Sequence, residues 1–210
     1  VTVYCSSSTS LEPKFFNAAT KLGEAMAKRG LELVYGGGGI GLMGEVARSL
    51  KKNGGRIHGI ITKRLLALEQ GYDGCDELMV VDTMSERKKL MAQHGEAFIA
   101  LPGGLGTFEE FFEVLVQRQV GEHCKPIGLV NLGGYYDPLI NLIDHGIEHR
   151  FIKPAVHGLL QVHEDPELLL DGGISGGKGR REGRAVGGGS GRSGGVQFYC
   201  CRQCQFSIPR

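Results

Sequence analysis

The chain of 210 residues contains no tryptophan, and aromatic residues make up only 7% of it. Proline is also scarce, with 7 residues, and the 35 glycines follow no three-residue period, which together exclude a collagen-like protein. Apolar runs of about 18 residues are absent, so the sequence contains no candidate transmembrane helix and we expect no membrane partner. The chain also lacks a recognisable signal peptide and an initiator methionine, which suggests a fragment. Because 41% of the residues are hydrophobic, the chain can still build a buried core.

The glycines and the charges divide the chain into two parts. Residues 172–210 contain 12 of the 35 glycines and have a formal charge of +6, which leaves −5 on residues 1–171. We predict a folded domain over residues 1–171 and a disordered, dispensable Gly/Arg-rich tail over residues 172–210. The mildly acidic domain argues against nucleic-acid binding through a broad basic face. Its scattered cysteines indicate a reducing, cytoplasmic setting.

Strand-like and helix-like segments alternate along the domain. Short apolar runs typical of strands are followed by longer segments in which apolar residues recur at helical spacing, as at Phe15, Leu22 and Met26. This alternation predicts an α/β fold, a Rossmann-like doubly wound parallel sheet flanked by helices in a single domain. The expected strands are residues 1–5, 31–35, 56–61, 77–81, 97–101 and 126–130, and the expected helices are residues 13–29, 42–52, 85–94, 107–120 and 138–150.

Three loops rich in glycine or serine follow strands of this predicted sheet, at residues 6–10, 36–41 and 102–106. In a parallel sheet such loops gather at the carboxyl ends of the strands, where ligands bind. Small residues let backbone N–H groups approach an anion at the N-terminus of the following helix. The organisation of the chain therefore predicts a ligand that carries a phosphate.

The second loop leads into Gly39-x-Gly41-x-x-Gly44, a pattern typical of dinucleotide-binding folds. Those folds also need an acidic residue about 20 positions further on, at the end of the next strand. Here that region reads Ile60-Ile61-Thr62-Lys63, and no acidic residue occurs before Glu69. We therefore favour a tight turn with close helix packing over NAD binding.

The third loop leads from a strand into a helix as Pro102-Gly-Gly-Leu-Gly-Thr107-Phe-Glu-Glu110. A phosphate here would meet several N–H groups, the Thr107 hydroxyl and the positive end of the helix. Thr107-x-x-Glu110 also has the spacing of a capping box, and local physics alone favours that structural role for Glu110. A run of basic residues, Arg87-Lys88-Lys89, lies near the start of another helix. It either pairs with an anion there or forms a solvated charged face.

Three further patterns are interpreted as chance matches. His145-x-x-Glu148-His149 has the order of a zinc motif but lies in an ordinary amphipathic helix, so we expect no metal site. Two G-x-S-x-G matches, which begin at Gly173 and Gly191, follow no strand. The run Cys200-Cys201-x-x-Cys204 lacks a partner pair at ligand spacing.

Three blocks together resemble one enzyme family. They are Tyr35-Gly-Gly-Gly-Gly-Ile-Gly-Leu-Met-Gly44, Arg87-Lys88, and Pro102–Glu110, which fits the pattern P-G-G-x-G-T-x-x-E throughout. Over about residues 1–170 the chain resembles the LONELY GUY (LOG) family of cytokinin riboside 5′-monophosphate phosphoribohydrolases. One departure is Cys5-Ser-Ser-Ser8, where the family usually has Cys-Gly-Ser-Ser. If that glycine has a positive φ, serine would cost about 1 kcal/mol there.

The resemblance implies hydrolysis of the N-glycosidic bond of N6-modified adenosine 5′-monophosphates to a free-base cytokinin and ribose 5-phosphate, without a cofactor or metal. It implies a homodimer, and it implies that Arg87 and Glu110 are the catalytic pair. Two alternatives stay open: a broader purine nucleotide glycosidase that acts on AMP, and a non-catalytic nucleotide or cofactor carrier on the same fold. No lysine is set up to hold pyridoxal phosphate, which argues against a lysine decarboxylase. The substrate-binding residues that the resemblance implies are Glu69, Arg87, Lys88, Gly103, Gly104, Leu105, Gly106, Thr107, Phe108 and Glu109.

Overall fold

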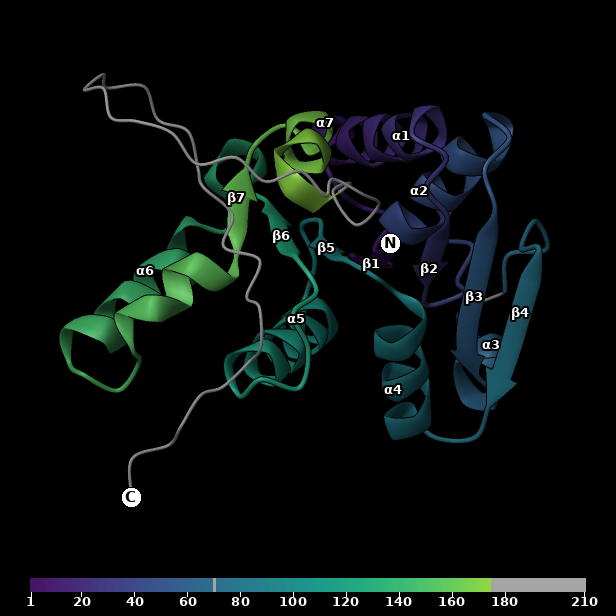
Figure 1. Ribbon diagram of the computed structural model, residues 1–210. Helices are drawn as coiled ribbons and strands as arrows, with labels where there is room; N and C mark the ends of the chain where they lie inside the picture. The colour runs from purple at the N-terminus through teal and green to yellow at the C-terminus, as the bar shows by residue number, and fades with distance from the viewer. Residues whose placement is uncertain (70, 175–210) are drawn as a thin grey trace, which may run out of the picture.

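A computed structural model describes residues 1–69 and 71–174 of the chain, which form a seven-stranded sheet with helices on both faces (Figure 1). All neighbouring strands are parallel, and their spatial order is β4-β3-β2-β1-β5-β6-β7. The predicted α/β class and parallel sheet are therefore confirmed. The strands are β1 Thr2–Tyr4, β2 Leu33–Tyr35, β3 Ile57–Thr62, β4 Glu77–Val81, β5 Phe98–Ala100, β6 Ile127–Val130 and β7 Gln161–His163.

The direction in which strands are added reverses at β1. From this strand the chain builds outward to β2, β3 and β4 on one side, and to β5, β6 and β7 on the other. In a doubly wound sheet, the crevice for a ligand opens at the carboxyl ends of the strands that flank such a reversal. The loops that follow β1 and β5 lie at this crevice, and the loop that follows β2 is next to it.

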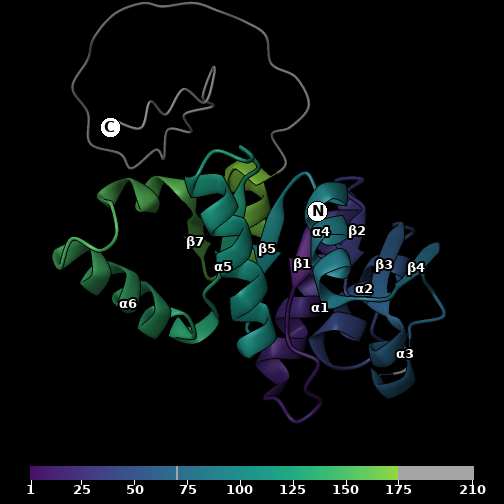
Figure 2. The same cartoon turned by 90° about the horizontal axis from the view of Figure 1, so that it is seen from below.

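The helices form one layer on each face of the sheet (Figures 1 and 2). Helices α1, α2 and α7 pack on one face, and α4 and α5 pack on the other, while α6 lies beyond β6 at one side of the molecule. None of the described helices is both long and apolar enough to cross a membrane. The helix bounds are α1 Pro13–Lys28, α2 Gly41–Lys52, α3 Lys63–Glu69, α4 Met84–His94, α5 Leu105–Gln119, α6 Asp137–Glu148 and α7 Pro166–Leu169.

Two hydrophobic clusters fill the space between the sheet and the helix layers. Because successive side chains of a strand point to opposite faces, Val3 packs with α1 and α2, whereas Tyr4 packs with α4 and α5. The neighbouring strand β5 continues the pattern, with Ile99 in the first cluster and Phe98 in the second. Strands buried on both faces are expected to be short and apolar, which is how they were recognised in the sequence.

The structure adds short elements that apolar periodicity did not predict. The connection between β3 and β4 contains α3, with 7 residues, and the segment after α6 contains β7, with 3 residues. Three further short helical segments are η1 Leu132–Gly134, η2 Pro154–Leu159 and η3 Leu170–Ile174. Elements of this length are too short for a periodic pattern to stand out. The predicted tail of residues 172–210 lies, from residue 175 onward, outside the described residues.

Candidate functional site

The turn that joins β2 to α2 is closed by the protein's own backbone. The N–H groups of Leu42 and Met43, in the first turn of α2, donate to the carbonyl oxygen of Ser6 at 2.9 and 3.4 Å. Gly41 has a φ of +59°, and a Cβ atom at this position would collide with the backbone of Ser7. The glycine pattern therefore serves a tight turn and close packing, as the sequence favoured, and a carbonyl already occupies the helix end.

The turn that joins β5 to α5 is open. Gly104 is the N-cap of α5, and no side chain caps the helix there. Within the described part of the chain, no acceptor lies in hydrogen-bonding geometry to the N–H groups of residues 103–107. Gly104, Leu105 and Gly106 are exposed. These donors, at the positive end of a helix, are therefore available to an anion.

A pocket of about 230 Å³ lies beside the open turn. Ser6, which lines this pocket, carries no backbone strain, because among the described non-glycine residues only Arg150 has a positive φ. The condition under which serine would be unfavourable there is therefore not met. Ser6 also joins the two turns. Its N–H donates to the carbonyl of Pro102 at 3.3 Å, and its own carbonyl accepts from the first N–H groups of α2. The lining combines the segments after β1, β5 and β6 and consists of Ser6, Leu11, Phe15, Pro102, Gly103, Gly104 and Tyr135.

Glu110 does not belong to a capping box. Helix α5 begins at Leu105, two residues before Thr107, so Thr107 is inside the helix and Glu110 lies beyond its first turn. The prediction of a cap is therefore wrong, because the earlier start moves both residues away from the N-cap position. The Thr107 hydroxyl instead lies against Gly103, where a Cβ atom would collide with it.

Glu110 faces Arg87 across the gap between α5 and α4. The distance from Arg87 Nη1 to Glu110 Oε1 is 3.3 Å, and the two side chains are 7% and 12% exposed. Arg87 is also held from behind, because its Nε donates to the carbonyl oxygen of Ile60 at 2.9 Å. Its guanidinium packs so closely on Gly36 that a Cβ atom there would collide with it. These contacts fix the guanidinium in one orientation, against Glu110.

Burial raises the pKa of the Glu110 carboxyl to about 7, and the Arg87 guanidinium opposes part of that rise. A carboxyl that titrates near neutral pH is suited to take up or release a proton during a reaction at that pH. Burial, and then the negative charge of Glu110, also raise the pKa of the Tyr4 hydroxyl and of the Cys5 thiol at the end of β1. Both groups therefore stay neutral beside a carboxyl that ionises.

Lys88 pairs with carboxylates of α5. Its Nζ lies 2.7 Å from Glu109 Oε1 and 3.1 Å from Glu113 Oε2, and the hydrogen bond to Glu109 raises the pKa of Lys88. Of the two interpretations of the basic run, pairing with an anion therefore applies to Arg87 and Lys88, and the anions are the protein's own acidic side chains. Phe108, also expected in the site, packs edge-to-face on Tyr136 with a centroid distance of 6.3 Å.

Glu69 is separated along the sheet from the open turn. It is the last residue of α3, which contacts β3 and β4. The chain that follows returns to the closed turn, where Gly71 pairs with Gly38 and the N–H of Tyr72 donates to the carbonyl of Gly37 at 3.0 Å. The helix that ends at Glu69 therefore lies beside β3 and β4, on the β2 side of the crevice. A second pocket, of about 260 Å³, lies here and is lined by Gly39, Ile40, Gly71, Tyr72 and Asp73.

Two tyrosines at the open turn were not among the residues expected in the site. The hydroxyl of Tyr135 donates to the carbonyl of Gly103 at 2.6 Å, and the hydroxyl of Tyr136 donates to that of Leu101 at 2.7 Å. They follow β6, which pairs with β5. No local sequence pattern could have located them, because their position depends on β6 lying next to β5, so that the loops after both strands meet at the same edge.

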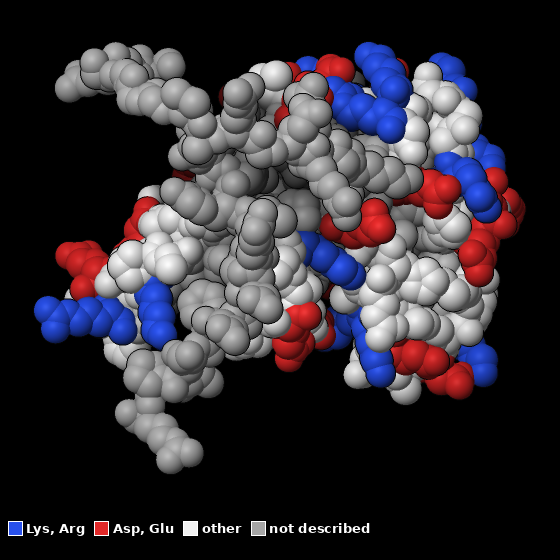
Figure 3. All heavy atoms as spheres, viewed as in Figure 1, with Lys and Arg blue, Asp and Glu red and all other residues white. Residues whose placement is uncertain are grey.

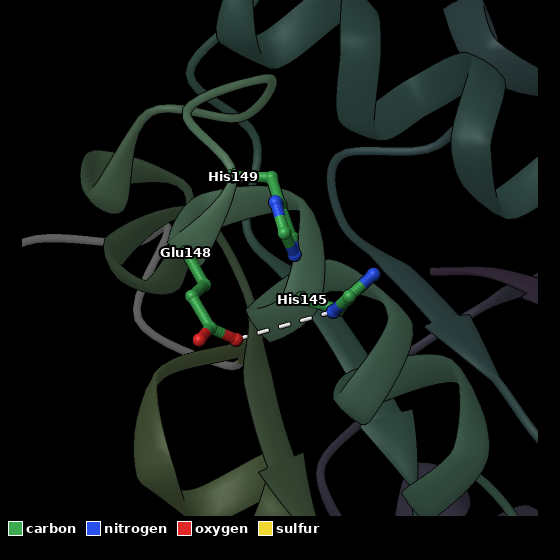
Figure 4. Close-up of side chains that lie close together, drawn as sticks. All are labelled: His145, Glu148 and His149. Atoms are coloured by element: carbon green, nitrogen blue, oxygen red, sulfur yellow. Dashed lines mark ion pairs between the residues drawn. The ribbon is translucent and has the colours of Figure 1, made fainter.

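The zinc-like pattern lies away from this crevice, at the end of α6 (Figure 4). The ligand atoms of His145, Glu148 and His149 lie within 4.8 Å of one another. All three residues are exposed, and His145 Nδ1 is 3.9 Å from Glu148 Oε2. The cluster follows from helical spacing alone, and no fourth side chain among the described residues joins it.

Charges of both signs are interspersed on the face seen in Figure 3. Ion pairs join several elements of the fold, such as Arg29 with Asp171 at 2.6 Å and Lys51 with Asp76 at 2.7 Å. The described part of this face thus carries mixed charge (Figure 3).

Comparison with known proteins gives consistent results. Residues 43–172 match a protein-family model described as "Possible lysine decarboxylase". The chain is 40% identical over 171 residues to the probable cytokinin riboside 5′-monophosphate phosphoribohydrolase LOGL2 of Oryza sativa subsp. japonica, which covers 81% of this chain and 70% of that protein. It is 42% identical over 160 residues to the cytokinin riboside 5′-monophosphate phosphoribohydrolase LOG3 of Arabidopsis thaliana, covering 76% and 74% of the two chains.

Solved structures share the fold at lower sequence identity. The molybdenum cofactor binding protein of Rippkaea orientalis superposes with a TM-score of 0.62 at 20% identity, covering 81% of this chain and 92% of that one. The molybdenum cofactor carrier protein of Chlamydomonas reinhardtii superposes with a TM-score of 0.60 at 21% identity, covering 79% and 89%. At this level of identity the likeness shows the fold alone.

Proposed function

The chain belongs to the LONELY GUY (LOG) family of cytokinin riboside 5′-monophosphate phosphoribohydrolases, and from this premise we propose that it hydrolyses the N-glycosidic bond of N6-modified adenosine 5′-monophosphates. The products are the free base, an active cytokinin, and ribose 5-phosphate. The protein is thus proposed to be a hydrolase that acts on N-glycosyl bonds.

The observation that carries this proposal is a buried arginine–carboxylate pair beside an open helix end. The N–H groups of residues 103–107 are suited to hold the 5′-phosphate of a nucleotide. Glu110 lies on the same helix, about one turn further along, where the ribose of that nucleotide would extend. A phosphate held at one end of a substrate keeps the reacting bond in register, so binding energy remote from the bond serves its cleavage.

In the proposed reaction, the bond between ribose C1′ and the purine nitrogen breaks and a water molecule adds to C1′. The Glu110 carboxylate stabilises the positive charge that builds on the ribose and takes one proton from the water. The purine leaves with the electron pair of the broken bond, and that proton restores it to the neutral base. Arg87 stabilises the negative charge that develops on the departing purine.

The remaining substrate contacts are proposed from the family resemblance and from position. Gly103, Gly104, Leu105, Gly106 and Thr107 supply the phosphate site, as their free N–H groups suggest. Lys88 and Glu109, already paired with each other, lie at its flank together with Phe108. Glu69 would contact the substrate from the β2 side of the crevice.

Two alternatives predict different products from the same site. A broader glycosidase would release adenine from AMP as readily as it releases an N6-modified base. A non-catalytic carrier would bind the phosphate-bearing ligand without releasing a base, and the fold is compatible with that role, since two proteins named for molybdenum cofactor binding and carriage share it. The pairing of Arg87 with Glu110 favours catalysis, because a carrier needs no buried carboxyl with a pKa near 7.

We also propose a homodimer located in the cytoplasm. Leu115 of α5 is buried in the core. Val116, in the same helix, and Val120, at its C-cap, are 51% and 62% exposed. The exposed apolar side chains are suited to contact a second copy of the chain. The thiols of Cys5 and Cys75 are free, which agrees with a reducing compartment.

The test is an incubation of the full chain with isopentenyladenosine 5′-monophosphate, followed by chromatography of the products. We expect isopentenyladenine and ribose 5-phosphate in equal amounts, and a slower release of adenine from AMP. Equal rates with the two nucleotides would favour the broader glycosidase. Tight binding of the nucleotide without any free base would contradict hydrolysis and favour the carrier.

A further inference from the structure

The backbone ahead of α5 is held by donors from outside the loop. The residues in question, 101–103, connect β5 to the N-cap and include the first glycine of the open turn. Each of their carbonyl groups accepts one hydrogen bond from a different donor. The donors are the Tyr136 hydroxyl to Leu101 at 2.7 Å, the Ser6 N–H to Pro102 at 3.3 Å, and the Tyr135 hydroxyl to Gly103 at 2.6 Å.

Holding a carbonyl also sets the direction of the next N–H. In a planar trans peptide unit, the N–H of one residue points opposite to the C=O of the residue before it. The bond from Tyr135 to the Gly103 carbonyl therefore turns the Gly104 N–H away from the tyrosine, and the bond from Ser6 to the Pro102 carbonyl sets the direction of the Gly103 N–H in the same way. The bond from Tyr136 to the Leu101 carbonyl orients no N–H, because residue 102 is a proline, and it instead anchors the start of the loop. Because glycine lacks a Cβ atom, these peptide planes would otherwise sample many orientations.

The two tyrosines are themselves anchored. The N–H of Tyr136 donates to Asn131 Oδ1 at 2.7 Å, and Asn131 Nδ2 donates to Asp137 Oδ1 at 2.7 Å. The Tyr135 and Tyr136 rings pack edge-to-face at 5.1 Å, and Phe15 packs on Tyr135 at 6.1 Å. The hydroxyl groups therefore reach the loop from a fixed support.

We infer that Tyr135 and Tyr136 are positioning residues, whose hydroxyl groups hold the loop of residues 101–104 with its N–H groups directed at a phosphate monoester before the ligand arrives. The inference rests on the proposed function, for which it specifies how the phosphate is recognised. Donors that are ordered in advance lose little conformational freedom on binding, so the phosphate is held more tightly. Neither tyrosine takes part in bond cleavage, and their effect falls on substrate affinity.

The variants Tyr135→Phe and Tyr136→Phe remove the hydroxyl groups and keep the rings. We expect Tyr135→Phe to weaken binding of ribose 5-phosphate about tenfold in calorimetric titration, the equivalent of about 1.4 kcal/mol. Tyr136→Phe should weaken it less, because the bond to Leu101 anchors the loop without orienting an N–H. With the nucleotide substrate, KM rises by a similar factor while kcat changes by less than about twofold, because uniform binding is lost and transition-state contacts remain. A role limited to general stability would lower kcat through loss of folded protein and leave the affinity of the folded fraction unchanged.

The matched control is Tyr35→Phe, which removes another tyrosine hydroxyl, bonded to Cys75 Sγ at 3.5 Å, from the side of the closed turn. It should leave the affinity for ribose 5-phosphate unchanged. If Tyr135→Phe binds ribose 5-phosphate with wild-type affinity and has an unchanged unfolding midpoint, the inference is overturned. If the variant Tyr136→Phe, at a buried position, does not fold, the result for Tyr135→Phe alone decides. A wild-type protein that binds ribose 5-phosphate but releases no base refutes the proposed hydrolysis and leaves the positioning role standing.

Discussion

Two glycine-rich turns flank the loop after β1 at the carboxyl edge of the sheet, and they use the same residue type for opposite purposes. In the α2 turn, the N–H groups of Leu42 and Met43 are taken by the carbonyl of Ser6. In the α5 turn, Gly104 is the N-cap, and the N–H groups of residues 103–107 have no acceptor among the described residues. Glycine closes the first turn by close packing and keeps the second accessible to a ligand.

The difference teaches that a glycine pattern does not by itself identify an anion site. At Gly41 a side chain would collide with backbone, whereas at Gly104 and Gly106 a Cβ atom would meet nothing within 4 Å. The closed turn still contributes to the site indirectly, since Gly36 leaves the space that the Arg87 guanidinium occupies. One turn therefore supports the Arg87–Glu110 pair from behind, and the other offers N–H groups to a ligand.

The largest effect on activity is expected from the variant Glu110→Gln, in the helix that follows the open turn. Glutamine preserves the size of the side chain and its acceptor for Arg87, but it carries no charge. We predict that kcat/KM for isopentenyladenosine 5′-monophosphate falls about 1,000-fold, within the range typical of a lost general acid–base group. Steady-state kinetics of purified protein with an unchanged unfolding curve is the measurement.

Near-normal turnover of Glu110→Gln would show that the residue is structural and that the open turn serves binding only. Arg87→Ala is a weaker test, because Arg87 is buried and its Nε also donates to the carbonyl of Ile60. Its removal would leave a cavity and an unpaired buried carboxyl, so activity and stability would fall together.

A pair of matched glycine variants probes the closed side. Gly41→Ala forces a side chain into a backbone with φ of +59° and against Ser7, and we predict a loss of about 2–4 kcal/mol in the free energy of unfolding. Gly104→Ala should stay within about 0.5 kcal/mol of the wild type. Urea unfolding measures both values. Equal losses in the two variants would erase the distinction between the turns.

The smallest effect expected is the dependence of activity on pH. Because the pKa of Glu110 is raised to about 7, the reactive carboxylate is present above that pH and is lost as pH falls. We predict that kcat/KM rises with pH, with a midpoint near 7 and about a tenth of the plateau at pH 6. The residual activity of Glu110→Gln should lack this midpoint and keep only the ionisation of the substrate phosphate.

The stability contribution of the same group has the opposite sign. Between its ordinary pKa of 4.5 and about 7, Glu110 in the folded protein keeps a proton that the unfolded chain has released. Its contribution to the free energy of unfolding therefore falls as pH rises through this window. Unfolding curves at pH 5 and pH 8 should show this fall in the wild type and a smaller one in Glu110→Gln.

The central strands were predictable because they are apolar runs buried on both faces. Most of the long helices were predictable because their buried apolar residues recur on one face. Helix α3 and strand β7 were missed, because 7 and 3 residues carry too little periodic signal. The start of α5 was misplaced by two residues, since the threonine–glutamate spacing imitates a cap. Because the helix starts at Leu105, Glu110 is too far along it to cap the helix, so the capping role that local sequence favoured is excluded.

The site was only partly predictable for a related reason. A run of glycines predicts a turn. Whether the N–H groups of that turn are free depends on whether a carbonyl from another loop accepts from them, as the Ser6 carbonyl does at α2. The contact of Arg87 with Glu110 spans 23 residues of sequence, and that of Tyr136 with Leu101 spans 35. Such contacts are set by the order of strands in the sheet, which local sequence patterns do not encode.

The most direct measurement is an NMR titration of the protein with ribose 5-phosphate, following the backbone amide resonances of both turns. If the α5 turn is the phosphate site, the amides of Gly103, Gly104 and Gly106 shift strongly, and those of Gly39 and Gly41 stay in place. Shifts confined to the α2 turn, with the α5 glycines unmoved, would contradict the assignment of the phosphate to the open helix end.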